Sequence, residues 1–83
     1  YSLFWWMDYG KIFALNMREA RKAVGMSQES LAGKCGITRN NIGTIERGEQ
    51  SPRLETMAAI ANALEMALPE LLIMKDLKKS ASS

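Results

Sequence analysis

The sequence predicts an all-α fold of five helices in one small domain. A chain of 83 residues has room for a single thin core, because a domain of this size buries only about 60% of its unfolded surface. Apolar residues recur at spacings of three and four, the period of an amphipathic helix. The sequence has no alternating run rich in Val, Ile and Thr and no Asn-Gly or Asp-Gly turn, so we expect no strands.

The composition argues against an enzyme, a metal protein and a membrane protein. One cysteine and no histidine exclude a disulfide framework, nearly every zinc site and any mechanism based on a histidine. The longest apolar runs are far shorter than the roughly 18–20 residues of a membrane span. We therefore expect a cytoplasmic protein without a metal, a cofactor or a membrane partner.

The first helix is predicted by an apolar face and a terminal glycine. Phe13, Met17, Ala20 and Val24 follow intervals of four, three and four, which places them on one side of a helix. Gly25 stands where a left-handed residue commonly ends a helix.

The second helix is expected to be barely two turns long. Ser27 caps its beginning and Gly36 ends it. Its buried side would be formed by Leu31, Ala32 and Cys35.

The third helix is expected from Arg39 to Arg47, between the capping residue Thr38 and Gly48. Only Ile42 and Ile45 are apolar within it. A helix with two core anchors and a broad polar face is poorly explained by packing alone. This pattern indicates that the polar face of the third helix is a binding surface.

Two further helices follow a polar loop that contains Pro52. The fourth has its apolar side at Leu54, Met57, Ile60, Ala61 and Leu64. Pro69 suits the first turn of a fifth helix, whose apolar residues are Leu71, Leu72, Ile73, Met74 and Leu77.

The segment from Met26 to Thr38, MSQESLAGKCGIT, combines with Ile42, the tetrapeptide IERG at 45–48 and Pro52. Together these residues resemble the lambda-repressor/Cro-like (XRE-type) helix-turn-helix family. The resemblance covers residues 13–73 and implies a five-helix DNA-binding domain, which we place at residues 10–78, before a disordered tail at 79–83. It also implies a bacterial or phage regulator whose partner is double-stranded DNA.

The third helix carries the residues expected to read bases. A narrow polar helix fits the major groove, where arginine pairs with guanine, asparagine with adenine and threonine with the thymine methyl group. Arg39, Asn40 and Thr44 lie opposite the two isoleucines, and Gly43 removes side-chain bulk from the same side. The resemblance implies base contacts at all four positions.

Phosphate contacts are expected mainly from the start of the second helix, where free N–H groups favour anions. Gln28 stands there and matches the family's phosphate-binding glutamine, and further candidates are Asn41, Arg47 and Arg53. The alternative for Gln28 is a hydrogen bond to its own backbone. The resemblance also implies that Arg21 and Glu46 form a structural ion pair rather than DNA contacts.

Two residues depart from the family pattern near the fourth helix. Glu65 replaces the glycine that usually follows this helix, so a left-handed residue there would be strained or replaced. Arg53 replaces the usual serine or threonine cap, which removes a cap and places a charge near DNA.

All six aromatic residues, at positions 1, 4, 5, 6, 9 and 13, lie near the start of the chain. Residues 1–9 therefore form an aromatic N-terminal extension. It either continues the first helix or is a leader or expression remnant. It is also a candidate surface for a second subunit or another protein.

The sequence favours a homodimeric, sequence-specific transcription regulator, most simply a repressor on a pseudo-palindromic operator. One such domain contacts few base pairs, so useful specificity requires two copies. The expected dimer contact is the apolar surface of Leu72, Ile73, Met74 and Leu77, with residues 3–9 as the competing contact. The alternative function is a protein-interaction module, such as an antitoxin that neutralises a partner through its aromatic N-terminus.

Overall fold

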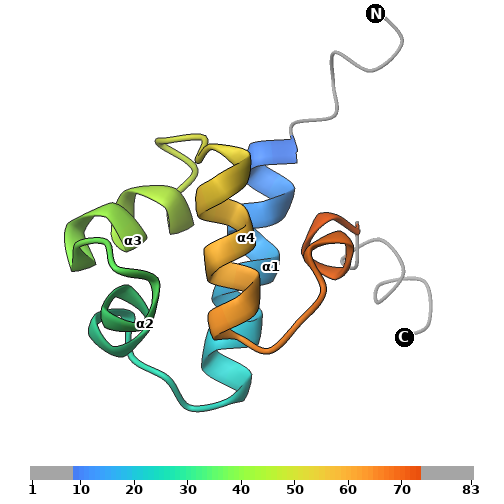
Figure 1. The fold of residues 1–83 in the computed structure, drawn as a ribbon. Coiled ribbons are helices and arrows are strands. Elements are labelled where there is room, and N and C mark those ends of the chain that lie inside the picture. Colours follow the sequence, from blue (N-terminus) through green and yellow to red (C-terminus); the bar gives the residue numbers. More distant parts are fainter. Residues whose placement is uncertain (1–8, 74–83) are drawn as a thin grey trace, which may run out of the picture.

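The structure is a computed structural model that describes residues 9–73. Within that range all regular secondary structure is helical (Figure 1). The four α-helices and the single 3-10 helix are α1 (Tyr9–Ala23), α2 (Gln28–Cys35), α3 (Arg39–Glu46), α4 (Leu54–Ala63) and η2 (Leu68–Leu72). Among the described residues, no helix has the length and hydropathy of a membrane span.

A single core holds the five elements together. α1 and α4 lie between the α2–α3 pair on one side of the molecule and η2 on the other (Figure 1). Every element contributes at least one side chain that is no more than 1% exposed, and these are Phe13, Met17, Leu31, Ile42, Ile45, Ile60 and Leu71. The burial of both isoleucines of α3 confirms that they are its core anchors.

Local capping chemistry sets the bounds of α2 and α3, as the sequence predicted. The Ser30 N–H donates to the Ser27 hydroxyl at 3.0 Å, and the Asn41 N–H donates to Thr38 Oγ1 at 3.1 Å. Gly36 follows α2 in the left-handed conformation, with φ of +76°. α3 ends at Glu46, one residue earlier than expected, and Arg47 is its C-cap.

The predicted fifth α-helix is wrong over the described residues. A 3-10 helix of five residues occupies Leu68–Leu72, and Ile73 is already extended, with φ of −92° and ψ of 139°. The amide of Asn16 holds the Leu71 and Ile73 carbonyl oxygens at 2.9 and 2.7 Å, which fixes the chain in this tight turn. Met74 and Leu77 lie outside the described residues.

Two residues expected in the core are exposed. Val24 is 61% exposed because α1 ends at Ala23, so Val24 lies in the following turn. Leu54 is 68% exposed at the first position of α4, where the helix has not yet reached the core. The apolar spacing therefore predicted the buried faces of α1 and α4 correctly except at one end of each helix. The error is Val24 after the last residue of α1 and Leu54 at the first residue of α4.

The lost cap at Arg53 and a left-handed residue at Glu65 are both observed near α4. Arg53 is the N-cap of α4 and its side chain makes no capping hydrogen bond. Glu65 adopts a left-handed φ of 58° and is the only described residue other than glycine with positive φ. That conformation is strained for a residue with a side chain.

Candidate nucleic-acid interface

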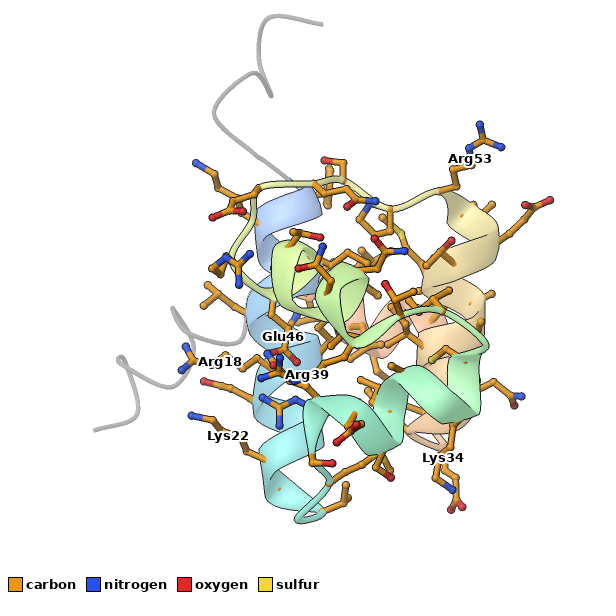
Figure 2. The ribbon with its side chains drawn as sticks, turned by 90° about the vertical axis from the view of Figure 1, so that its left-hand side faces the viewer. Arg18, Lys22, Lys34, Arg39, Glu46 and Arg53 are labelled. Atoms are coloured by element: carbon orange, nitrogen blue, oxygen red, sulfur yellow. The ribbon has the colours of Figure 1, made fainter. Side chains whose placement is uncertain are left out.

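α3 presents a polar face that α2 flanks. Arg39 and Asn40 at the beginning of α3 are exposed, whereas Asn41 and Thr44 are half-buried. In Figure 2 the α2–α3 pair faces the viewer, with the Arg39 side chain in front. The two base-contact candidates with the longest polar side chains are therefore open to solvent at one end of α3.

An ion pair fixes α3 against α1. Arg21 donates from Nε to Glu46 Oε2 at 2.6 Å and from Nη2 to Glu46 Oε1 at 3.1 Å. Its third nitrogen, Nη1, donates to the Met26 carbonyl oxygen at 2.9 Å. The side chains are only 11% and 3% exposed, so each charge is buried with its counter-charge. The pair implied by the family resemblance is therefore present in the structure.

Gln28 joins this network from the first residue of α2. Its Nε2 donates to Glu46 Oε1 at 2.9 Å, so the side chain reaches the ion pair rather than its own backbone. A carboxamide nitrogen carries two donors. Glu46 uses one and thereby orients the other, which suits Gln28 to an anion at the start of α2.

Arg47 and Gly43 lie against each other on the outer side of α3. Gly43 is buried, and a Cβ placed on it would be 3.1 Å from Arg47 Nη1. The Arg47 guanidinium pairs with Glu49, with Nε and Nη2 donating to the two carboxylate oxygens at 2.9 and 3.2 Å. A base edge can therefore approach Gly43 only when the Arg47 guanidinium moves.

The pairing with Arg47 also affects the charge of Glu49. A hydrogen bond and a Coulombic attraction from Arg47 hold the pKa of the Glu49 carboxyl below its ordinary value. Glu49 thus stays ionised beside the polar face of α3, where it would repel an anion.

The Thr44 hydroxyl has two acceptors within reach of its single proton. Its Oγ1 lies 2.9 Å from the Asn41 carbonyl oxygen and 2.9 Å from Gln50 Oε1. Gln50 lies in the loop after α3, and it was not among the expected site residues. The left-handed Gly48, at φ of +76°, is the signal that the chain reverses there.

The basic side chains labelled in Figure 2 do not all gather around Arg39. Arg18 and Lys22 project from α1 on the left of Figure 2, next to the α2–α3 pair that carries Arg39. Arg53 projects from the beginning of α4 at the upper right, and Lys34 from α2 at the lower right. The structure therefore does not bring Arg53 next to Arg39.

The remaining site predictions concern the end of the chain and its first residues. Ile73 is 51% exposed, whereas Leu72 is half-buried against the core. Of residues 1–9, only Tyr9 is described, so an N-terminal partner surface lies outside the described residues. Within residues 9–73, no group of three or more His, Cys, Asp or Glu side chains could hold a metal ion.

The chain is similar in sequence to known helix-turn-helix proteins. A model of the helix-turn-helix family matches residues 17–71. The control protein C.SmaI of Serratia marcescens is 40% identical over 72 residues, which are 87% of this chain and 86% of C.SmaI.

Two solved structures resemble the fold over most of its length. The restriction-modification controller protein C.AhdI from Aeromonas hydrophila has a TM-score of 0.72 and 37% identity, covering 75% of this chain and 94% of its own. The hypothetical transcription factor NHTF from Neisseria has a TM-score of 0.78 and 36% identity, covering 86% of this chain and 84% of its own.

Proposed function

Because this chain belongs to the lambda-repressor/Cro-like (XRE-type) helix-turn-helix family of DNA-binding transcription regulators, we propose that it binds one operator sequence as a homodimer. One observation carries the proposal. α3 buries both of its isoleucines and exposes Arg39 and Asn40 at its beginning. A helix anchored in this way fits the width of the major groove.

Each side chain then has a defined task. Arg39 pairs with a guanine and Asn40 with an adenine, because these side chains match the hydrogen-bond patterns of those bases. Gln28 and the start of α2 hold the sugar–phosphate backbone, which positions α3 without reading sequence. The Arg21–Glu46 pair keeps α2 and α3 in the orientation that both contacts require.

The regulator is of the restriction-modification controller type. This finer assignment is supported by the likeness to the control protein C.SmaI and to C.AhdI, which extends over most of each relative. Bound over a promoter, the dimer acts as a repressor by occupying DNA that RNA polymerase needs.

Dimerisation supplies specificity that one domain lacks. A single domain of this kind reads only a few base pairs, so two copies on a pseudo-palindrome are required. The exposed Ile73, at the end of η2, begins the apolar contact between the copies. This contact lies on the opposite side of the core from α3, so both copies can present α3 to successive major grooves about 34 Å apart.

The test is footprinting on the DNA upstream of the protein's own gene. We expect protection of two half-sites related by two-fold symmetry, about one helical turn apart. Protection that ignores sequence would contradict the proposal. Binding that appears only when the product of the neighbouring gene is added would instead favour the protein-interaction alternative.

A further inference from the structure

The loop that follows α3 is fixed at both of its ends. At its beginning, the Gly48 N–H donates to the Ile45 carbonyl oxygen and the Glu49 N–H to the Thr44 carbonyl oxygen, both at 3.0 Å. With Gly48 left-handed, these two bonds form a Schellman motif, which reverses the chain at a helix end. At its far end, Pro52 is buried. The residues between are therefore held back alongside α3.

This reversal places Gln50 against α3. Gln50 Oε1 lies 2.9 Å from Thr44 Oγ1, although Gln50 itself is exposed. The Thr44 hydroxyl has a second acceptor, the Asn41 carbonyl oxygen, also at 2.9 Å. A hydroxyl has one proton and accepts through its lone pairs. Because either internal acceptor takes that proton, Thr44 offers a DNA groove its oxygen lone pairs and its methyl group.

Gln50 supplies the complementary group. With Oε1 turned toward Thr44, the two N–H donors of Nε2 face away from that hydroxyl. The two neighbouring side chains thus carry a hydrogen-bond donor, an acceptor and a methyl group between them. This combination extends the polar face of α3 with a residue from outside the helix.

We propose that Gln50 is a specificity-determining residue that reads one A·T base pair together with Thr44. In the major groove, adenine offers an acceptor at N7 and a donor at N6, and thymine offers a methyl group. Gln50 Nε2 donates to N7, Thr44 Oγ1 accepts from N6, and the two methyl groups meet. Guanine has the acceptor O6 where adenine has its donor, so it faces the threonine oxygen unfavourably.

The experiment is selection of binding sites from random duplexes with the full chain and its variants. The role of Gln50 rests on the proposed function, because the wild type must first select a motif. Gln50→Ala should lose roughly tenfold of the preference for A·T at one position of each half-site, the scale of a single base contact. Thr44→Val, which keeps the shape and loses the hydroxyl, should relax the same position.

Two variants distinguish base reading from support of the loop. Gln50→Glu keeps an acceptor for Thr44 and removes the N–H donors, so it should relax that position as Gln50→Ala does. Gln28→Ala, the same change at a phosphate contact, should weaken all sequences alike. An unchanged motif in Gln50→Ala, or relaxation at a G·C position, would overturn the role of Gln50 and leave the proposed function standing. A wild type that selects no motif would overturn the proposed function as well.

Discussion

Arg21 on α1 and Glu46 at the end of α3 are joined by two hydrogen bonds, of 2.6 and 3.1 Å, between side chains that are 11% and 3% exposed. The same guanidinium holds the Met26 carbonyl, and the same carboxylate accepts from Gln28. One pair therefore ties α1, the turn after it, α2 and α3 together. The pair therefore links α3 to both of the helices that precede it.

Removing either partner should strongly destabilise the fold. Arg21→Ala or Glu46→Ala leaves a buried charge without its counter-charge, which costs about 3–5 kcal/mol. The double variant should lose less than the sum of the single variants, with a coupling of about 1–3 kcal/mol. Urea denaturation of the four proteins measures this. Arg18→Ala, an exposed arginine on the same helix, is the control and should change stability by less than about 0.5 kcal/mol. Additive losses would show that the pair is not coupled.

Glu49 should restrain binding to DNA. Its carboxylate holds Arg47 at 2.9 and 3.2 Å, and Arg47 is a candidate phosphate contact. Glu49→Gln should release Arg47 and strengthen binding to duplexes of any sequence a few-fold, as fluorescence anisotropy at fixed salt would measure. Glu65→Gln removes the same charge after the far end of α4 and is the control. Equal gains from the two variants would assign the effect to net charge alone.

The pH dependence of this restraint follows from the direction of the pKa shift. Arg47 lowers the pKa of Glu49, so the pair is intact above the ordinary carboxyl range and is lost as pH falls through the lowered pKa. Between pH 7 and pH 5 the Glu49 carboxylate should therefore stay paired with Arg47. The affinity of the wild type for DNA should remain below that of Glu49→Gln throughout this range.

Glycine should stabilise the turn after α4. Glu65 has a φ of 58°, and a left-handed conformation costs a residue with a side chain about 1–2 kcal/mol. Glu65→Gly should therefore raise the free energy of unfolding by about 0.5–1 kcal/mol, after the entropy cost of glycine. A thermal melt should show a gain of roughly 4 °C. Glu55→Gly, within the helical first turn of α4, should have the opposite sign. Destabilisation by both changes would contradict strain at Glu65.

The dimer contact is testable at Ile73. Sedimentation at micromolar concentration should show a dimer, and Ile73→Asp should shift it toward monomer and weaken operator binding, because a charge is costly in an apolar contact. Leu54→Asp places the same charge on a residue that is 68% exposed at α4 and should leave the dimer intact. A dimer that survives Ile73→Asp and is lost on deletion of residues 1–9 would move the contact to the aromatic segment.

The features that the sequence predicted well are those fixed by neighbouring residues. Ser27 and Thr38 cap their helices through N–H groups three residues away, and Gly25, Gly36 and Gly48 are left-handed as expected of residues that end helices. Such chemistry is local, so it is visible in a short stretch of sequence.

The features that the sequence did not predict depend on distant residues. Asn16 reads as a polar residue of α1, yet it is 5% exposed because its partners, the carbonyls of Leu71 and Ile73, come from the other end of the domain. The same bonds hold the chain in the η2 turn where an α-helix was expected. Gln50 was missed because its place beside Thr44 depends on the turn at Gly48.

In the proposed function, α3 reads sequence through Arg39. The most direct measurement is the affinity of the wild type and Arg39→Ala for a set of single-base variants of the selected operator. Arg39→Ala should cost about 1–3 kcal/mol and abolish the preference at one G·C pair in each half-site, with every other position unchanged. Gln28→Ala, measured on the same set, should lower every affinity by the same factor. A uniform loss in Arg39→Ala, with every base preference retained, would contradict the claim.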